Sequence, residues 1–478
     1  MAGVVAAGAA QTAEAGAEIL RCGGNAVDAA IAGAVAAFVA EPLLASAGGG
    51  GIMTLAMPGQ EPASIDFFSH MPGLGGRAAE LDFFAIDIDF GPVTQEFHIG
   101  RGSAAVPGIL PGLAEAHRRY GSLPLADLMA PAIRLANQGV EVSAEVAHVF
   151  DLIWPILAVD RDTVRVLAGG RRPEPGDRLG NPEFGEVLRE FAALGRTPDR
   201  VVEGLLDEFG PARGGMITES DIAAFKPKVG PPRVDTYGDW SVYLPATPGG
   251  GVTMTILHDL AQSAQSSEER VEVLRYARAS RAGHAERKHF TAPGSTTHIS
   301  VVDTERGAAS VTLTNGEGCG YLIPGTGIAV NNFLGEADLN PAGFHSHEPG
   351  VRLPTMVAPC VGVRHGVPAL ALGSGGSNRI RSAVGGVLYR VVVVGQSIEE
   401  AVRAPRVHAE DDAVWVELEG MSDPEAVVAR LAGDFVDVHR FARRDFFFGG
   451  VHAAALDESG SPHGIGDSRR GGVSLCSF

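Results

Sequence analysis

The chain has 478 residues, of which 45% are hydrophobic and 20% charged, and its formal net charge is −19. Its length allows two or three average domains or one large unit with two lobes. The acidic balance disfavours nucleic acid and anionic membranes as partners, because both require basic surface. Residues 1–5 lack the basic and apolar regions of a signal peptide, and the apolar run 29–40 is too short to span a bilayer. We therefore expect a cytoplasmic protein.

The four cysteines, at positions 22, 319, 360 and 476, are scattered, and none forms a Cys-x-x-Cys pair. This spacing indicates reduced thiols, with neither a zinc site nor a disulfide framework.

The first half of the chain is predicted to be mainly helical. Asn25 is a candidate N-cap between two helices, which we expect at 12–22 and up to Ala40. The glycine run 48–51 precedes an apolar segment, which indicates a backbone that approaches a neighbour closely before it becomes a strand. No Lys-Ser/Thr pair follows that run, so a phosphate-binding loop is disfavoured. The remaining expectations are a short strand ending at 66–72, an irregular loop over 73–102 and mostly helix over 145–230.

The strongest boundary in the sequence lies near residue 295. We expect an exposed linker at 291–295, where a chain can be cut, and after it strands at 297–303, 308–314, 357–364, 367–373 and 451–456. If the peptide bond before Thr296 is cut, its hydroxyl and a new α-amine lie on one residue. An α-amine has a reference pKa of about 7.7–8.0, so it can act as the base for that hydroxyl.

Two further features are candidates for the same chemistry. Residues 304–307 form a good hairpin loop, and pairing of Asp303 with Ala308 would bring Thr296 close to Thr314 and Asn315. The run 373–380 passes from a strand into a helix, where backbone N–H groups suit a developing oxyanion. Each feature also has an ordinary interpretation, because Thr is a good strand residue and the glycines suit a tight turn.

The chain resembles the γ-glutamyltranspeptidase family of N-terminal-nucleophile hydrolases over nearly its whole length. One of the matching motifs is Thr296-Thr297-His298, and each match is weak when taken alone. The order and spacing of twelve short matches make the resemblance specific; they lie at 23–30, 41–42, 48–51, 106–108, 120–121, 131–136, 296–298, 325–328, 331–332, 375–376, 404–406 and 467–470.

This resemblance implies an α+β protein with a four-layer αββα sandwich. It also implies a proenzyme that cleaves itself between Ser295 and Thr296 into chains 1–295 and 296–478, which stay associated, and a homodimer is possible. By the same resemblance Thr296 is the nucleophile, Thr314 orients it, and Gly375 and Gly376 supply the oxyanion hole. Neither a metal nor an organic cofactor is expected.

The sequence departs from the family where the glutamyl group is bound. The family has Asp-Phe-Arg where this chain has Asp66-Phe67-Phe68, and Phe cannot replace an Arg–carboxylate clamp. Thr355 stands in a changed Ser-Ser-Met motif, and Glu336 is the acid left to meet an amine. Asn315 is a further candidate for substrate binding, and Phe68, His70 and Phe333 are candidate pocket residues.

These departures resemble the acylase-like branch of the family, so we expect hydrolysis of a small-molecule amide through an acyl-Thr296 ester. One alternative is a genuine γ-glutamyl hydrolase or transferase acting on glutathione-like substrates, with another cation such as Arg101 holding the carboxylate. The other alternative is an unprocessed pseudoenzyme with a structural or interaction role.

Overall fold

Two antiparallel sheets form the centre of the molecule in the computed structural model, which describes residues 2–89, 94–263, 265–285 and 295–477. The first sheet has seven strands, in the order β22 (Val473–Ser477), β1 (Gly3–Ala7), β11 (Thr296–Asp303), β12 (Ala308–Thr314), β2 (Gly50–Ala56), β3 (Ala63–Asp66) and β8 (Lys228–Gly230). The second has six, in the order β21 (Pro462–Ile465), β20 (Gly450–Leu456), β16 (Val367–Gly375), β15 (Cys360–Arg364), β10 (Trp240–Leu244) and β9 (Arg233–Tyr237).

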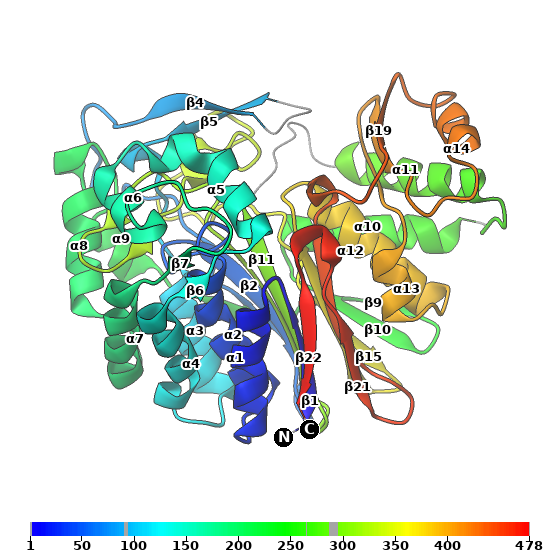
Figure 1. Ribbon diagram of the computed structural model, residues 1–478, viewed down its shortest axis with the longest axis horizontal. Coiled ribbons are helices and arrows are strands. Elements are labelled where there is room, and N and C mark those ends of the chain that lie inside the picture. Colours follow the sequence, from blue (N-terminus) through cyan, green and yellow to red (C-terminus); the bar gives the residue numbers. More distant parts are fainter. Residues whose placement is uncertain (1, 90–93, 264, 286–294, 478) are drawn as a thin grey trace.

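The two sheets pack face to face, with β11 against β16 and β20. Their shared interior is apolar at one end, where Val302 and Ala308 meet Val361, Ala371 and Ala454. Pairing of β1 with both β11 and β22 brings the two termini together, and Figure 1 shows them side by side at one end of the sandwich.

Helices cover the outer face of each sheet, so the fold has four layers, αββα, and belongs to the α+β class as expected (Figure 1). The helices on the side of the first sheet are α1 (Ala10–Arg21), α2 (Ala26–Ala40), α3 (Ile109–Tyr120), α4 (Leu125–Gln138), α5 (Ala144–Leu157), α6 (Arg161–Ala168), α7 (Pro182–Leu194), α8 (Asp199–Phe209) and α9 (Glu219–Ala224). Those on the side of the second sheet are α10 (Pro248–Gln262), α11 (Glu269–Ala285), α12 (Arg379–Leu388), α13 (Ile398–Arg403) and α14 (Pro424–Leu431).

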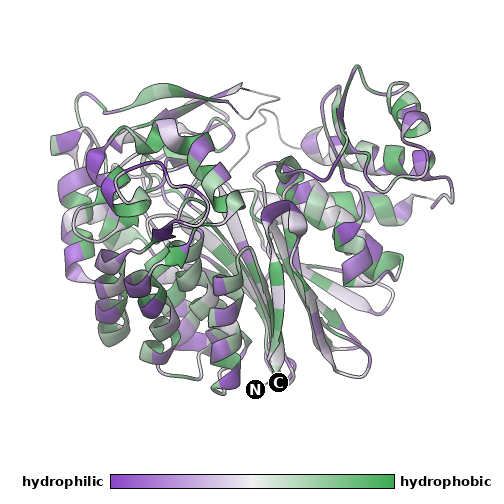
Figure 2. Ribbon diagram, in the orientation of Figure 1, coloured by the Kyte–Doolittle hydropathy of each residue, from purple (hydrophilic) through white to green (hydrophobic). Residues whose placement is uncertain are grey.

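Helix α2 shows how local sequence sets this arrangement. The Asn25 side chain accepts hydrogen bonds from the N–H groups of Val27 and Asp28, and Asp28 bonds back to the N–H of Asn25. This capping box fixes the start of the helix. Every residue of α2 is buried, because its Ala-rich surface lets it lie between β11 and the outer helices. Figure 2 shows hydrophobic and hydrophilic residues alternating along the outer helices, as expected for helices with one face against the protein.

Four small sheets complete the fold. They are the strand pairs β4 (Phe84–Asp89) with β5 (Thr94–Ile99), β6 (Val140–Glu141) with β7 (Arg178–Leu179) and β13 (Leu322–Ile323) with β14 (Ile328–Ala329), and the three strands β17 (Val407–Glu410), β18 (Ala413–Glu417) and β19 (Asp437–Phe441). The prediction of an irregular loop over 73–102 was therefore wrong in part. Phe97 and Ile88 of the β4–β5 hairpin are buried against α5, a tertiary contact that local sequence did not reveal.

The helices over the described residues include none that is both long enough and apolar enough to cross a membrane.

Candidate active site

Thr296 and Thr314 face each other at the ends of two central strands of the first sheet. Thr296 is the first residue of β11, Thr314 is the last of β12, and the two are directly paired across the strands. The predicted proximity of the two threonines is confirmed, although the register differs by one residue because Ala308 pairs with Val302 and not with Asp303. In the observed register both side chains reach the same cavity.

The peptide bond before Thr296 is held by the hydroxyl of Thr314. The Thr314 hydroxyl donates a 2.6 Å hydrogen bond to the carbonyl oxygen of Ser295, and it accepts one of 3.1 Å from the N–H of Gly316. Ser295 is buried, which corrects the expectation of an exposed linker at this residue; residues 291–294 of that linker lie outside the described residues. The 295–296 bond therefore joins two buried residues.

The glycine run before β2 allows the backbone to approach Thr314. A Cβ atom on Gly49 would lie 2.1 Å from the carbonyl oxygen of Thr314, and one on Gly48 would lie 2.2 Å from that of Ala329. Real Cβ atoms do not approach backbone atoms this closely, so only glycine fits at these positions. The close approach predicted from the sequence is confirmed.

Gly375 and Gly376 lie beside Thr296, at the end of β16. A Cβ atom on Gly375 would lie 2.2 Å from the carbonyl oxygen of Thr296, so the two backbones are in direct contact. Gly376 has a φ of +123°, a conformation that side chains disfavour, and its missing Cβ makes room for Gly449. The strand-to-helix transition predicted here is confirmed by β16 and α12.

His298 is not available as a base for Thr296, although the two side chains lie on the same face of β11. One ring nitrogen of His298 bonds to the hydroxyl of Thr312 and the other to that of Ser300, both at 2.8 Å. Burial lowers the pKa of His298 well below its ordinary value. The neutral imidazole of His298 therefore has both nitrogens occupied by hydrogen bonds, one of them to the neighbouring strand β12. The base that accepts the hydroxyl proton of Thr296 must be another group.

Three carboxyl groups gather around the same strand ends. Glu317 accepts hydrogen bonds from both the N–H and the hydroxyl of Ser295, while Glu336 and Asp338 line the cavity. Burial raises the pKa of Glu317 to about 7, and burial together with Asp338 raises the pKa of Glu336 well above its ordinary value. Like charges in one buried site disfavour full ionisation, so this cluster holds protons at neutral pH.

Two buried arginines, Arg379 at the start of α12 and Arg470 in the helical turn before β22, place positive charge near this cluster. The guanidinium of Arg470 lies over the ring of Phe446 at 3.7 Å, and its Nη1 is 3.3 Å from the position of a Cβ on Gly375. Burial, followed by the charge of Arg379, lowers the pKa of Arg470 to about 9. Arg406 forms an ion pair with Asp467, which also accepts the N–H of Val451. Arg470 therefore places positive charge behind the Gly375–Gly376 turn.

The cavity beside Thr296 is small and mainly apolar. Phe68 and Phe333 stack with ring centroids 4.7 Å apart and both are buried. None of the described residues that line the cavity is Lys or Arg; the twelve are Phe68, Thr296, Thr314, Phe333, Glu336, Asp338, Leu339, Thr355, Met356, Val357, Ser377 and Ile380. Three of the four residues predicted to bind substrate, namely Phe68, Glu336 and Thr355, are thus brought to the cavity that Thr296 lines.

Three other candidates lie elsewhere. Asn315 follows Thr314 but does not line the cavity. His70 packs against Phe225 with ring centroids 4.6 Å apart, and burial lowers its pKa to about 4. Arg101 pairs with Asp82 and Glu208, so its charge is already neutralised away from the cavity.

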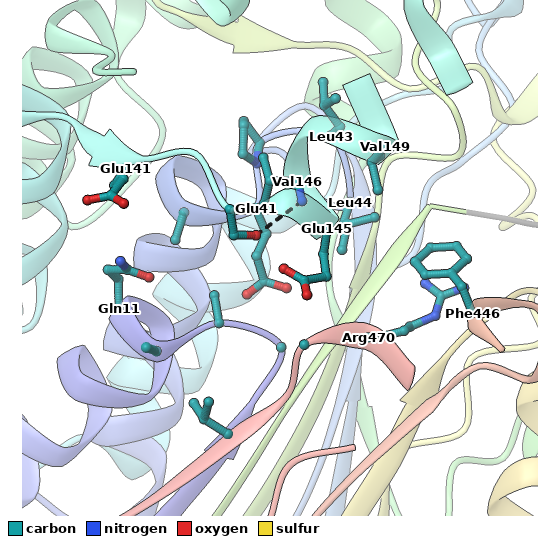
Figure 3. A pocket seen from close by; sticks show the side chains of 18 residues that line it. Gln11, Glu41, Leu43, Leu44, Glu141, Glu145, Val146, Val149, Phe446 and Arg470 are labelled. Atoms are coloured by element: carbon teal, nitrogen blue, oxygen red, sulfur yellow. Dashed lines mark hydrogen bonds between the residues drawn. The ribbon is translucent and has the colours of Figure 1, made fainter. Parts of the chain in front are cut away.

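A second and larger cavity lies on the other side of the β11 strand end, with about 880 Å³ of space that is partly open to solvent. Figure 3 shows Glu41, Glu145 and Arg470 around it. Thr296 does not line this cavity, but Glu41 accepts a 2.7 Å hydrogen bond from the hydroxyl of Thr297. This larger cavity therefore lies next to Thr296, but the side chain of Thr296 does not reach it.

No group of His, Cys, Asp and Glu among the described residues has an arrangement that could hold a metal ion.

Sequence reasoning missed three charged residues of the site, Glu317, Asp338 and Arg470. Glu317 carried a usable signal, since it lies between two glycines only three residues after Thr314 and so stays near that strand end. Arg470 lies in the family match at 467–470 but was given no role, and Asp338 carried no signal because its segment reaches the site only in the folded chain.

A sandwich of two helix-covered sheets, with a threonine at a strand end and a glycine turn beside it, defines the class of N-terminal-nucleophile hydrolases. The model of the gamma-glutamyltranspeptidase family matches residues 12–292 and 262–477, and the chain belongs to that family. It is 30% identical to the acylase ACY 1 proenzyme of Pseudomonas sp. (strain SE83), over 96% of this chain and 90% of that protein.

Two further comparisons agree with this assignment. The glutathione hydrolase proenzyme of Pseudomonas aeruginosa is 28% identical, over 85% of this chain and 82% of that protein. In fold, the chain is similar to the cephalosporin acylase from Bacillus halodurans, with a TM-score of 0.81, 21% identity and coverage of 99% of this chain and 95% of that one. The chain is thus a hydrolase of this family, and its relatives include both acylases and glutathione hydrolases.

Proposed function

We propose that this protein is a self-cleaving amidohydrolase that uses Thr296 as its N-terminal nucleophile. The observation that carries the proposal is the 2.6 Å hydrogen bond from the Thr314 hydroxyl to the carbonyl oxygen of Ser295, at the junction where β11 begins. A donor at that oxygen stabilises the negative charge that develops when the carbonyl carbon is attacked.

The first reaction is cleavage of the chain itself. The Thr296 Oγ attacks the carbonyl carbon of Ser295, its proton passes to the Thr296 nitrogen, and the carbon–nitrogen bond breaks to leave an ester. Water then hydrolyses the ester, which yields a Ser295 carboxylate and frees the hydroxyl and α-amine of Thr296. Chains 1–295 and 296–478 would stay together, because β1 and β2 of the first chain pair with β11 and β12 of the second.

The second reaction is hydrolysis of an amide substrate. The free α-amine takes the proton of the Thr296 hydroxyl, the oxygen attacks the substrate carbonyl, and the leaving amine receives the proton. Water then releases the acyl group from Thr296. The α-amine is the fitting base, because both ring nitrogens of His298 are already hydrogen-bonded. The N–H groups of Gly375 and Gly376 would hold the oxyanion, with the charge of Arg470 behind them.

The cavity favours an acyl group without a carboxylate. Phe68 and Phe333 offer an apolar surface, and Glu336 and Asp338 repel an anion or accept an amine. A γ-glutamyl group would place its α-carboxylate in a site with acids and no described basic residue. We therefore favour an acylase with an apolar or amine-bearing acyl group. Similarity to a glutathione hydrolase makes γ-glutamyl hydrolysis the second candidate.

Mass spectrometry of the purified protein tests the proposal first. We expect two fragments divided between residues 295 and 296, and a Thr296→Ala variant that stays uncut. A wild-type chain that remains whole would refute the mechanism and favour a pseudoenzyme.

Anilides of an apolar acid and of γ-glutamate then separate the two candidates. Faster release of aniline from the apolar anilide supports the acylase, whereas a preference for the γ-glutamyl anilide supports the glutathione-like activity.

A further inference from the structure

Glu317 holds the residue that precedes the proposed cleavage site with two hydrogen bonds. One carboxylate oxygen accepts the Ser295 N–H at 3.2 Å, and the other accepts the Ser295 hydroxyl at 2.6 Å. The backbone N–H of Glu317 donates to the side chain of Asn332 at 2.8 Å, which fixes the loop that carries it. Thr314 bonds to the carbonyl oxygen of the same serine. Three polar groups of Ser295 are thus held by two residues, Thr314 at the end of β12 and Glu317 in the loop that follows it.

We propose that Glu317 is the positioning residue for self-cleavage, and that it expels Ser295 from the site once the bond is cut. This inference rests on the proposed self-cleavage at Thr296. Before cleavage the carboxylate orients Ser295, so that its carbonyl meets the Thr314 hydroxyl and lies in reach of the attacking oxygen. After cleavage Ser295 carries a carboxylate of its own, next to that of Glu317.

The chemistry of Ser295 explains why an acid is suited to this position. Both of the groups that reach Glu317 are donors, and an ionised carboxylate offers only acceptors. A glutamine could still accept from the Ser295 N–H, but its NH₂ group would have to donate to the Ser295 hydroxyl, so the two charge-assisted bonds would be replaced by weaker neutral ones.

Cleavage would turn the attraction between Glu317 and Ser295 into a repulsion. Two carboxylates that share a buried site cannot both stay ionised, so the new Ser295 terminus must take up a proton or leave. Departure of Ser295 would remove the chain end that precedes Thr296 and open the space beside the new α-amine.

The charge of Glu317 depends on all the ionisable groups that face it. Arg470 and Arg379 favour its ionised form, while Asp338 and Glu336 oppose it. Burial is the largest effect and brings the pKa of Glu317 to about 7. The rate of self-cleavage should therefore change with pH across the neutral range.

The test compares uncut precursors made by cell-free synthesis and follows the two fragments over time on a gel. We expect Glu317→Gln to slow cleavage about 10- to 100-fold, as loss of a hydrogen bond to a charged group implies, and Glu317→Ala to slow it further. Glu317→Asp should recover part of the rate. Ser295→Ala keeps the N–H contact and should fall between Glu317→Gln and the wild type.

The pH profile separates positioning from a structural role. The wild-type rate should vary with an apparent pKa near 7, and this dependence should disappear in Glu317→Gln. Asp303→Asn is the matched control, because Asp303 is a buried carboxyl with a raised pKa at the other end of β11. That variant should lose thermal stability yet keep the cleavage rate and its pH profile.

The outcomes are distinct. Cleavage of Glu317→Gln at the wild-type rate with an unchanged pH profile would overturn this inference and leave the proposed function intact. A wild-type chain that never cleaves would overturn both. If Glu317→Gln fails to fold, the Ser295→Ala and Glu317→Asp rates decide, and normal rates in both overturn the inference.

Discussion

The peptide junction at Thr296 and the cavity beside it are built differently. At the junction, Thr314 and Glu317 both bond to Ser295, and the register of β11 with β12 sets their positions. In the cavity, Phe333 lies in a short 3-10 helix and Glu336 and Thr355 lie on loops, and the Oε1 of Glu336 has no hydrogen-bond partner among the described residues. A sheet register allows little variation, whereas loops tolerate many side chains. The sheets would thus determine the type of reaction, and the loops would determine which substrate binds.

The largest loss of activity is expected from a substitution at Gly375, where β16 of the second sheet contacts β11 of the first. Gly375→Ala would place a Cβ 2.2 Å from the carbonyl oxygen of Thr296, which must displace the backbone of the nucleophile. We expect self-cleavage and amide turnover to fall by about 10³-fold or more, since small misplacements of reacting groups are costly. Gly230→Ala is the control, because a Cβ there meets nothing within 4 Å. Equal activity of the two variants would contradict the prediction.

Removing the hydroxyl of Thr314 tests the junction without changing its shape. Thr314→Val should slow self-cleavage by about 10²- to 10³-fold, the usual cost of losing one oxyanion donor. Thr314→Ser keeps the donor and should stay within about tenfold of the wild type. The rate of fragment formation on a gel measures both. A Val variant that is cut as fast as the Ser variant would show that the hydrogen bond to Ser295 plays no part.

The pH dependence of stability probes the acid at the junction. Burial raises the pKa of Glu317 from 4.5 to about 7, so the folded chain binds more protons than the unfolded chain between these values. Stability should then fall as pH rises through this window, by up to about 3 kcal/mol for this group. Melting of the uncut Thr296→Ala protein at about pH 5 and pH 8 measures the loss. Adding Glu317→Gln should make the loss smaller; an unchanged loss would assign it to other groups.

A substitution at Phe68 tests the role of the cavity in substrate binding. Phe68→Leu loses the stack with Phe333 but stays apolar. We expect kcat/KM for an apolar acyl anilide to fall about tenfold, the scale of a modest change in a hydrophobic pocket, with self-cleavage unchanged. Phe38→Leu is the matched control, because Phe38 packs against Phe184 in the helical layer, away from the cavity. A similar fall in kcat/KM for both variants would indicate a general loss of packing.

The smallest effect on substrate preference is expected from a substitution at Arg101. Its pairs with Asp82 and Glu208 leave it outside the cavity, so Arg101→Lys should change the ratio of kcat/KM for apolar and γ-glutamyl anilides by less than about twofold. A selective loss of γ-glutamyl hydrolysis would instead identify Arg101 as the carboxylate clamp and favour the second candidate function.

Local sequence was enough to predict much of the fold. The Asn25 cap, the close approach at the glycine run before β2 and the strands β11 and β12 were all predicted correctly, because caps, close approaches and strand-forming residues are encoded in the local sequence. The junction at residue 295 was also visible, as a change from loop formers to strand formers. Its burial was not, since burial depends on what packs around a segment.

Only the tertiary structure decided which groups surround that junction. Glu317, Asp338 and Arg470 come from three separate segments outside the two sheets, and the pKa shifts of Glu317 and Arg470 arise from burial and mutual charge that no local pattern contains. The structure likewise removed Arg101 and His70 from the cavity by giving them other contacts. By itself the sequence determined most helices and strands and identified Thr296 as the candidate nucleophile. Long-range packing determined which charged side chains surround Thr296.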